Sequence, residues 1–396
     1  MNIKKIVDSI ILLPIIWVFS GFLIFPNGSK IIVPIIILSI ITNLVYYKNY
    51  KLKGNLKNPY LFVIIINIFI GSIMYYTIGF GSGEIRSYIA ISLYLLLTNK
   101  TIIDKKNLTY LTLLAACISF FLLIYNVFTL EIPRGVQVFN PIPYANVLTI
   151  YAVVSLYLLL CRRSYLLFIS YFLLLAGIFL TETRGAIIPV IIVSLLMIDT
   201  HLYKTNKLKP SYIGIMLTPL IIAMSLSYNQ IEERINSTLV EIHKISNGDM
   251  TSSIGLRFQM WKSARYSFIK SPIYGLGDSH REVLIELNKE GLVDDSLVKF
   301  SPNHYHNQFI DKLVKTGIIG LISMLTLLLT PLIVAYKNKK ESKSLIFYLT
   351  LLMAISCLTD VPINHPVVLM PFLLINYIFI SDMWKCSNDD TSKPPH

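Results

Sequence analysis

The chain has 396 residues, of which 54% are hydrophobic and 14% are charged, and its mean hydropathy is +0.63. A soluble domain carries roughly 25% charged residues, so this composition excludes a cytosolic enzyme, a disordered chain and a coiled-coil or collagen-like fibre. Because long apolar stretches recur along the whole chain, we predict an all-α integral membrane protein with many transmembrane helices.

Twelve apolar segments approach the length of about 20 residues that a helix needs to cross the hydrocarbon core. They cover residues 9–25, 30–47, 59–80, 84–98, 108–130, 143–160, 165–180, 185–200, 211–228, 314–335, 344–361 and 366–382. No small-residue cleavage site follows the first segment, so we interpret it as a retained anchor. The expected organisation is nine spans within residues 1–228, a long loop over 229–313, three spans within 314–382 and a tail over 383–396.

The basic residues are distributed unevenly between the two sets of alternate loops. One set, with both termini, holds 20 of the 35 Lys and Arg residues, whereas the short loops of the other set hold four. The positive-inside rule therefore places both termini in the cytoplasm and the long loop at the outer face. The 11 basic residues from 228 to 316 are balanced by 11 acidic ones. The net charge of +13 thus reflects topology, and no nucleic-acid partner is expected.

The long outer loop is too long for a simple connector and too short for an ordinary independent domain, as functional lids often are. Its pattern predicts helices near residues 231–246, 254–270 and 279–290, and a last helix that begins near His304 and continues into the tenth span. The Gly275-Leu276-Gly277 sequence lacks the rest of a phosphate-binding signature, so we interpret it as a tight turn.

Two groups of arginines near the outer face have both a functional and an ordinary interpretation. Arg184 follows Glu182 at the expected start of the eighth span, where it can bind a diphosphate beside a helix N-terminus or anchor at lipid headgroups. Arg257 and Arg265 lie on an amphipathic helix. They are either phosphate ligands or parts of an interfacial helix whose aromatic residues, including Trp261, lie at the headgroups.

Two histidines enter the expected last helix of the loop. His304 and His306 would point about 200° apart on a helix, so neither a shared metal ion nor a cofactor is predicted there. His306 is either a catalytic base or a surface residue, and the neighbouring Asn307 and Asp311 can orient its imidazole. Asp360, in the last outer loop, either faces the same cavity or is an ordinary turn residue.

Four sequence patterns follow one another along the second half of the chain. They are a Thr-x-x-Arg-Gly-Ala turn, a Gly-x-Arg-(x)3-Trp helix, a Pro-x-x-Gly-x-Gly turn and a His-Asn-(x)9-Gly-(x)2-Gly helix entry. The residues concerned are Thr181, Arg184, Gly185, Ala186, Gly255, Arg257, Trp261, Pro272, Gly275, Gly277, His306, Asn307, Gly317 and Gly320. Their order resembles that of the O-antigen ligase family of Gram-negative bacteria, over roughly Thr181 to Gly320. The N-terminal half matches that family only in hydropathy.

The resemblance implies a metal-independent, inverting glycosyltransferase of the bacterial inner membrane, with its active site facing the periplasm. Such enzymes take a glycan from undecaprenyl diphosphate, and ligases transfer it to a sugar hydroxyl of lipid A–core during lipopolysaccharide biosynthesis. It implies that Arg184, Arg257 and His306 are the catalytic residues. The expected substrate-binding residues are Arg265, with weaker support from the pattern, and Glu182, Asn307, His304 and Asp360.

Other activities fit the same sequence features. An O-antigen polymerase would use the same donor with a second lipid-linked glycan as acceptor, and a protein O-oligosaccharyltransferase would use a protein. A transporter or flippase of lipid-linked sugars would need as many spans, but it favours polar or broken helices near the middle of the membrane. Here the polar residues gather at one face, which favours transfer of a glycan at the outer surface.

Overall fold

The computed structural model describes residues 3–47, 58–98, 105–136, 140–162, 164–205, 210–226, 228–338 and 342–381. These residues are predominantly helical and contain no β-strand, which confirms the all-α prediction. The tail expected over 383–396 lies outside them, as do parts of the predicted cytoplasmic loops, such as residues 48–57 and 99–104.

A bundle of apolar helices makes up most of the molecule. Its helices are α1 (Ile3–Val18), α2 (Gly21–Ile24), α3 (Gly28–Tyr46), α5 (Pro59–Ile78), α6 (Ser82–Leu97), α7 (Lys105–Ile124), α8 (Pro141–Arg162), α9 (Tyr165–Leu180), α10 (Arg184–Thr205), α11 (Pro210–Leu226), α16 (Gln308–Lys337), α17 (Lys343–Thr359) and α18 (Pro366–Ile380). Among the described residues, seven helical segments are long and apolar enough to cross a membrane, and α9, α17 and α18 are shorter apolar helices. The chain is therefore a multi-pass membrane protein.

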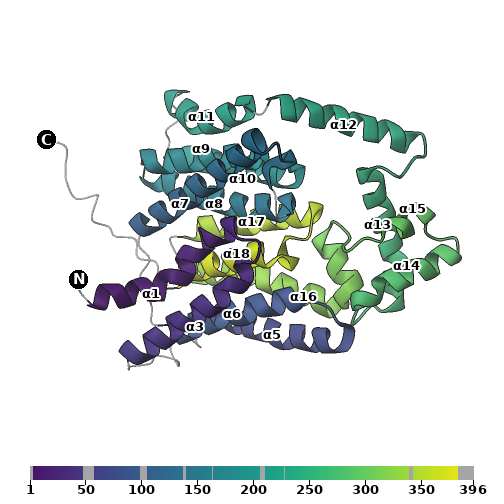
Figure 1. Cartoon of the computed structure of the whole chain (residues 1–396), viewed down its shortest axis with the longest axis horizontal. Coiled ribbons are helices and arrows are strands. Elements are labelled where there is room, and N and C mark those ends of the chain that lie inside the picture. Colours follow the sequence, from purple (N-terminus) through teal and green to yellow (C-terminus); the bar gives the residue numbers. More distant parts are fainter. Residues whose placement is uncertain are drawn as a thin grey trace.

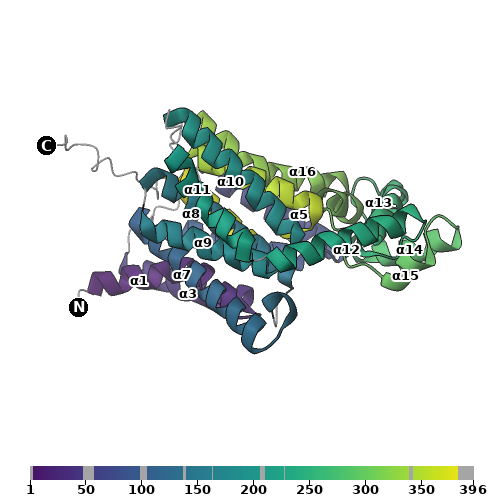
Figure 2. The same ribbon diagram turned by 90° about the horizontal axis from the view of Figure 1, so that it is seen from above.

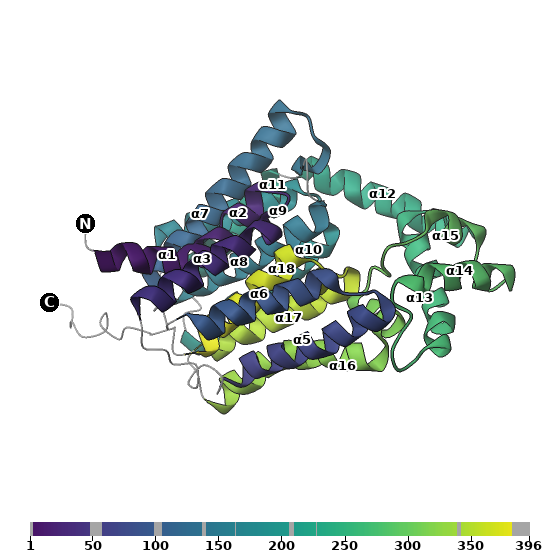
Figure 3. The same ribbon diagram turned by 60° about the horizontal axis from the view of Figure 1, so that its bottom comes forward.

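The bundle helices lie side by side with roughly parallel axes (Figure 1). The outer loop forms α12 (Tyr228–Ser246), α13 (Ser253–Lys270), α14 (His280–Lys289) and α15 (Asp295–Phe300). Helices α13, α14 and α15 gather at the end of the bundle opposite the start of α1, and α12 reaches across to them from α11 (Figures 1 and 2). Helices α5 and α16 run together along one side of the bundle (Figure 3).

Helix α8 occupies the centre of the bundle. Of its most apolar stretch, 89% is buried, and it packs against α7, α9, α10, α17 and α18. A helix that is apolar all round can be buried on every side, which explains why large side chains such as Tyr144 and Tyr151 fit inside the bundle. By contrast, α5 is 22% buried and presents most of its apolar surface outward, as a lipid-facing helix does.

The outer loop has a small hydrophobic core of its own. Its buried residues are Met260, Ala264, Val283, Leu284, Leu287, Val293, Leu297, Tyr305 and Val314. Helix α15 was not predicted from the sequence, and the last helix begins at Gln308 rather than near His304. Asn307 caps that helix by accepting hydrogen bonds from the backbone N–H groups of Phe309 and Ile310, so the preceding residues are not helical.

Helix α16 is broken at Gly317, where φ is +63° and ψ is −164°. At this break the Ile318 N–H donates to the carbonyl of Pro272 at 2.9 Å, outside its own helix. A Cβ atom on residue 317 would lie 2.2 Å from the Ile273 carbonyl oxygen. Only glycine tolerates both this backbone conformation and this close approach.

The turn after α13 interlocks with the broken helix. The Leu276 N–H donates to the Val314 carbonyl at 2.8 Å, and Gly275 has φ +76°. A Cβ atom there would lie 2.3 Å from the backbone of Lys315. The tight-turn interpretation of this glycine-rich segment is therefore confirmed, and the glycines of two of the sequence patterns belong to one backbone contact.

Replacing Gly317 by alanine should destabilise the protein by at least about 3 kcal/mol, because backbone strain adds to the overlap with Ile273. The drop should appear as a lower midpoint of thermal unfolding in detergent. Gly214→Ala is the matched control, since a Cβ atom on residue 214 of α11 meets nothing within 4 Å. A Gly317→Ala protein as stable as Gly214→Ala would disprove this role for Gly317.

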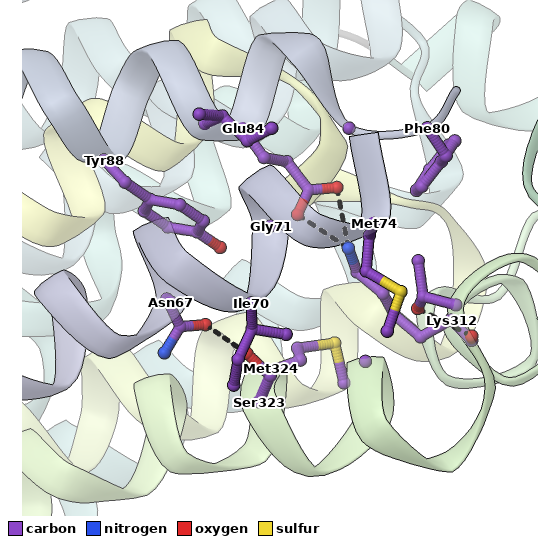
Figure 4. A pocket seen from close by; sticks show the side chains of 14 residues that line it. Asn67, Ile70, Gly71, Met74, Phe80, Glu84, Tyr88, Lys312, Ser323 and Met324 are labelled. Atoms are coloured by element: carbon purple, nitrogen blue, oxygen red, sulfur yellow. Dashed lines mark hydrogen bonds and ion pairs between the residues drawn. The ribbon is translucent and has the colours of Figure 1, made fainter. Parts of the chain in front are cut away.

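A buried ion pair joins α16 to α6 (Figure 4). Lys312 Nζ lies 2.7 and 2.6 Å from the two carboxylate oxygens of Glu84, and both side chains are less than one-tenth exposed. Nearby, the Ser323 hydroxyl donates to Asn67 Oδ1 at 2.7 Å, and the two interactions border a cavity of about 30 Å³. These polar contacts fix α16 against α5 and α6 in a setting where unpaired groups are costly.

Lys312→Met should lower stability by about 3–5 kcal/mol, because the Glu84 carboxylate would remain buried without its partner. The double variant Lys312→Met with Glu84→Gln removes the lone charge and should regain most of that loss. The unfolding midpoints in detergent of the wild type, Lys312→Met, Glu84→Gln and the double variant together give the coupling energy between the two side chains. A double variant no better than Lys312→Met would contradict this account.

Candidate active site

Arg184 is the first residue of α10, where free backbone N–H groups add positive potential. Its Nη1 donates to Thr238 Oγ1 at 2.5 Å, and its Nη2 lies 3.3 Å from Glu241 Oε1. Both partners belong to α12. The Arg184 side chain is 37% exposed, so it is accessible to a ligand.

The turn that precedes Arg184 is held by an arginine from another loop. Arg134 Nε donates to the Thr181 carbonyl at 2.9 Å, and its Nη2 donates to Thr183 Oγ1 at 2.8 Å. Sequence reasoning counted Arg134 only among the outer-face cations. Glu182, at φ +50° in the same turn, is half-buried, and its part in substrate binding remains a prediction.

Arg257 lies in the second turn of α13, which Ser252 caps through the Gly255 N–H. Burial lowers the pKa of the Arg257 guanidinium, the charges of Asp360 and Glu241 raise it, and the charge of Arg184 lowers it. These three groups are therefore near enough for their charges to act on the guanidinium. It makes no hydrogen bond or ion pair among the described residues, which leaves its donors available to an anion.

His304, His306 and Asp360 converge beside the two arginines. The two imidazole rings lie 4.2 Å apart between centroids, and His306 Nδ1 lies 3.4 Å from Asp360 Oδ1. The expectation that the two histidines point apart is wrong, because the segment is not helical and His306 has φ +47°. Residues 304 and 306 of an extended or irregular segment can face the same side.

The backbone around the histidines is fixed from three sides. Trp261 Nε1 donates to the Tyr305 carbonyl at 2.9 Å, and the Tyr305 N–H donates to Asp311 Oδ1 at 3.2 Å. Asn307 Nδ2 donates to the Leu358 carbonyl at 3.2 Å. Trp261 therefore packs inside the outer loop, which contradicts the alternative that places it at lipid headgroups. Asp311 binds the backbone of Tyr305, whereas the sequence predicted that it could orient the imidazole of His306.

Asp360 comes directly after α17 and is 2% exposed. Burial raises the pKa of its carboxyl group, but His306 and the charges of His365 and His304 outweigh burial, so the pKa lies below its usual range. Burial, followed by the charge of His306, lowers the pKa of His304 to about 4. At neutral pH Asp360 is therefore an anion and His304 a neutral imidazole.

The buried Gln308 and the half-buried Asn364 fasten the loop of Asp360 to the segment that carries His306. Gln308 Nε2 donates to Asn364 Oδ1 at 2.8 Å, and its Oε1 accepts from the Ile363 N–H at 2.9 Å. Asn364 Nδ2 in turn donates to Asp311 Oδ2 at 2.8 Å. Sequence reasoning missed these residues, because amides over 50 positions apart give no local signal.

Among the described residues, no hydrogen bond or ion pair joins the remaining predicted residue to this cluster. Arg265, two turns beyond Arg257 on α13, is exposed and has no hydrogen bond or ion pair among the described residues. Its part in substrate binding stays a prediction. Arg184, Arg257, His306 and Asp360 come from four different segments. The charges of Arg184 and Asp360 both act on Arg257, and Asp360 faces His306.

Comparison with known proteins identifies the segment that builds most of this cluster. A family model described as O-antigen ligase matches residues 169–325, which include Arg184, Arg257 and His306. The chain carries an O-antigen ligase family domain. The family resemblance predicted from the four sequence patterns is thus confirmed. Asp360 lies beyond the matched residues of this O-antigen ligase domain.

Three relatives are each 26% identical to this chain over part of its length. An O-antigen ligase of Escherichia coli matches over 161 residues, 40% of this chain and 38% of that protein. An uncharacterized protein of Haemophilus influenzae matches over 162 residues, 40% of each chain. A ComP-specific O-oligosaccharyltransferase of Acinetobacter baylyi matches over 215 residues, 53% of this chain and 37% of that protein. The matches span about two fifths of each relative.

Proposed function

We propose that this protein is an O-antigen ligase of the bacterial inner membrane. It takes a glycan from undecaprenyl diphosphate and transfers it to a sugar hydroxyl of lipid A–core. The observation that carries the proposal is the meeting of two arginines with a His–Asp pair at one end of the bundle. An arginine pair suits a diphosphate leaving group, and a histidine beside a carboxylate suits a base.

The topology of the proposal follows the charge distribution. All twelve predicted spans coincide with helices, α6 and α11 included, and we propose that all twelve cross the membrane. Helix α1 starts at the end of the bundle opposite α13–α15 (Figure 1), so a cytoplasmic N-terminus puts the cluster in the periplasm. Undecaprenyl diphosphate would then enter sideways from the bilayer.

The proposed reaction is a single displacement with inversion. The acceptor hydroxyl attacks the anomeric carbon, a new C–O glycosidic bond forms, and the bond from that carbon to the phosphate oxygen breaks. The electron pair leaves with the diphosphate, whose growing charge Arg184 and Arg257 neutralise. The diphosphate would take the place of Glu241 on the Arg184 guanidinium. Since the donor brings its own leaving group, neither ATP nor a metal ion is required.

His306 would accept the proton of the attacking hydroxyl. Asp360 faces His306 Nδ1 at 3.4 Å, which favours the tautomer that carries its proton on Nδ1. The lone pair of Nε2 is then free to act as the base. Arg257, close to Asp360, keeps that carboxylate ionised as the imidazole becomes charged.

A cavity of about 230 Å³ near His365 is a candidate site for part of the acceptor. It is lined by Phe22, Phe25, Pro26, Gly28, Ser29, Asn140, Pro143, Tyr144, His365, Pro366 and Val367. Aromatic and proline side chains beside a few amide and hydroxyl groups suit a sugar ring. The charge of Asp360 acts on His365, so the cavity adjoins the cluster.

A protein O-oligosaccharyltransferase is the second candidate, because the Acinetobacter relative with that name matches 53% of this chain. Purified protein in liposomes, given undecaprenyl-diphosphate glycan and lipid A–core without ATP or added metal, tests the choice. Glycan on lipid A–core supports the ligase. Longer glycans that stay on undecaprenyl diphosphate would instead identify a polymerase, and transfer only to an added acceptor protein would identify the oligosaccharyltransferase. The absence of any new product would instead favour a transporter of lipid-linked sugars.

A further inference from the structure

His304, His306 and Asp360 leave an unusual set of polar atoms without partners. Four buried atoms, Nδ1 of both histidines and both oxygens of Asp360, have no hydrogen-bond partner among the described residues. Buried polar groups are hydrogen-bonded in the great majority of cases. One donor atom from each of the three side chains lies within 4.8 Å of the other two. The three side chains thus share a common centre, to which each can offer a lone pair once both histidines carry their ring proton on the other nitrogen.

The spacing of these atoms fits a metal ion better than a direct hydrogen bond. His306 Nδ1 and Asp360 Oδ1 are 3.4 Å apart and form no aligned hydrogen bond. Two ligands of a tetrahedral ion with bonds of about 2.0–2.1 Å lie about 3.3 Å apart. The pair therefore already has the separation of one tetrahedral edge, and a ring nitrogen of His304 completes a group of three ligand atoms within 4.8 Å of one another.

We propose that His304, His306 and Asp360 bind a divalent transition-metal ion, with Zn²⁺ the best match, and that the bound ion inhibits the protein. Two imidazoles and one carboxylate with an open fourth position are a ligand set that zinc accepts. The binding half stands on geometry alone, whereas the inhibitory half rests on the proposed function. The ion is an inhibitor here, and the transfer reaction itself does not use it.

Inhibition follows from the tautomer of His306. The proposed base needs its proton on Nδ1 and its lone pair on Nε2. A metal ion bound to Nδ1 takes that lone pair, so the ring proton must reside on Nε2, which can no longer accept one. The metal ion therefore requires the His306 tautomer with its proton on Nε2, whereas the transfer reaction requires the tautomer with its proton on Nδ1. The positive charge of Arg257 close to Asp360 opposes a second cation, so we expect reversible binding.

Titration with Co²⁺ alone, on purified protein in detergent and without any glycan, tests the site. The wild type should take up roughly one ion per chain with visible absorption bands of a low-coordinate site, and Zn²⁺ should abolish them. His304→Ala and Asp360→Asn should each weaken binding by more than the ~10–100-fold that loss of an outer-shell partner costs. His243→Ala, at an exposed histidine of α12, should bind as the wild type does.

The wild-type titration decides the proposal however the variants fold. No Co²⁺ uptake by the wild type would overturn it, and so would full uptake by a folded His304→Ala protein. In the transfer assay, added Zn²⁺ should reduce the rate in step with occupancy, and a chelator should restore it. If the protein binds Zn²⁺ and keeps its full transfer rate, the inference that the bound ion inhibits through the His306 tautomer is wrong. A chain without transferase activity would refute the proposed function while the Co²⁺ titration still decided the metal site.

Discussion

His306→Ala should lower the rate of glycan transfer by about 10²–10⁴-fold, the usual contribution of a general base. The imidazole is the group that can take the proton of the acceptor hydroxyl. Its Nδ1 lies 3.4 Å from Asp360 Oδ1, and its ring centroid lies 4.2 Å from that of His304. The measurement is the initial rate at saturating donor and acceptor in liposomes, with thermal unfolding as a check on folding.

The matched control for this variant is His243→Ala, because His243 is exposed on α12 and lies outside the cluster. It should transfer glycan at the wild-type rate. A folded His306→Ala protein that keeps the normal rate would refute the assignment of the base, and Arg184 and Arg257 would then remain as a donor-binding pair without a catalytic histidine.

Arg257→Ala should reduce kcat by about 10²–10³-fold, the typical cost of losing one donor to developing negative charge. Arg257 is half-buried and makes no hydrogen bond or ion pair among the described residues, so the loss of a structural contact should not mask the effect. The kcat of Arg257→Lys should lie between those of the wild type and Arg257→Ala, since a lysine keeps the charge but loses the paired donors.

Lys262→Ala, at an exposed position of the same helix, provides the control and should leave kcat unchanged. The split between kcat and KM is the informative readout for Arg257. A loss in kcat indicates stabilisation of the departing diphosphate, whereas a rise in KM alone would show that Arg257 only binds the ground state and would contradict its catalytic role.

Hydropathy was sufficient to place the helices of the bundle, because a spanning helix must satisfy every backbone group within itself. The outer domain was harder, since its segments are short and mixed in polarity. Asn307 could have corrected the predicted start of the last helix, because asparagine is a strong helix cap. A cap at that position excludes a helix that begins at His304. The whole error over the direction of the two imidazoles follows from that one boundary.

Other features had no local signal at all. The break at Gly317 exists because the 272–277 turn supplies carbonyl groups from more than 40 residues away. Arg134 donates to Thr183, next to Arg184, and Asn364 donates to Asp311, in both cases across about 50 residues of sequence. Sequence patterns can place a catalytic residue near the right surface. The contacts that orient the catalytic side chain form only when segments distant in the sequence fold together, so the sequence gives no sign of them.

The interlocked backbone at Gly317 means that residues 229–313 are no separable unit. The turn at 272–277 exchanges backbone hydrogen bonds with Val314 and Ile318, and Val314 completes the small core of the outer domain. A fragment cut at residue 313 would lose that core residue and leave the turn's carbonyls unpaired. Hydrogen exchange should therefore detect one cooperative foldon that joins the outer domain to the first turns of α16. We therefore expect residues 229–313 to fold completely only once helix α16 is in place.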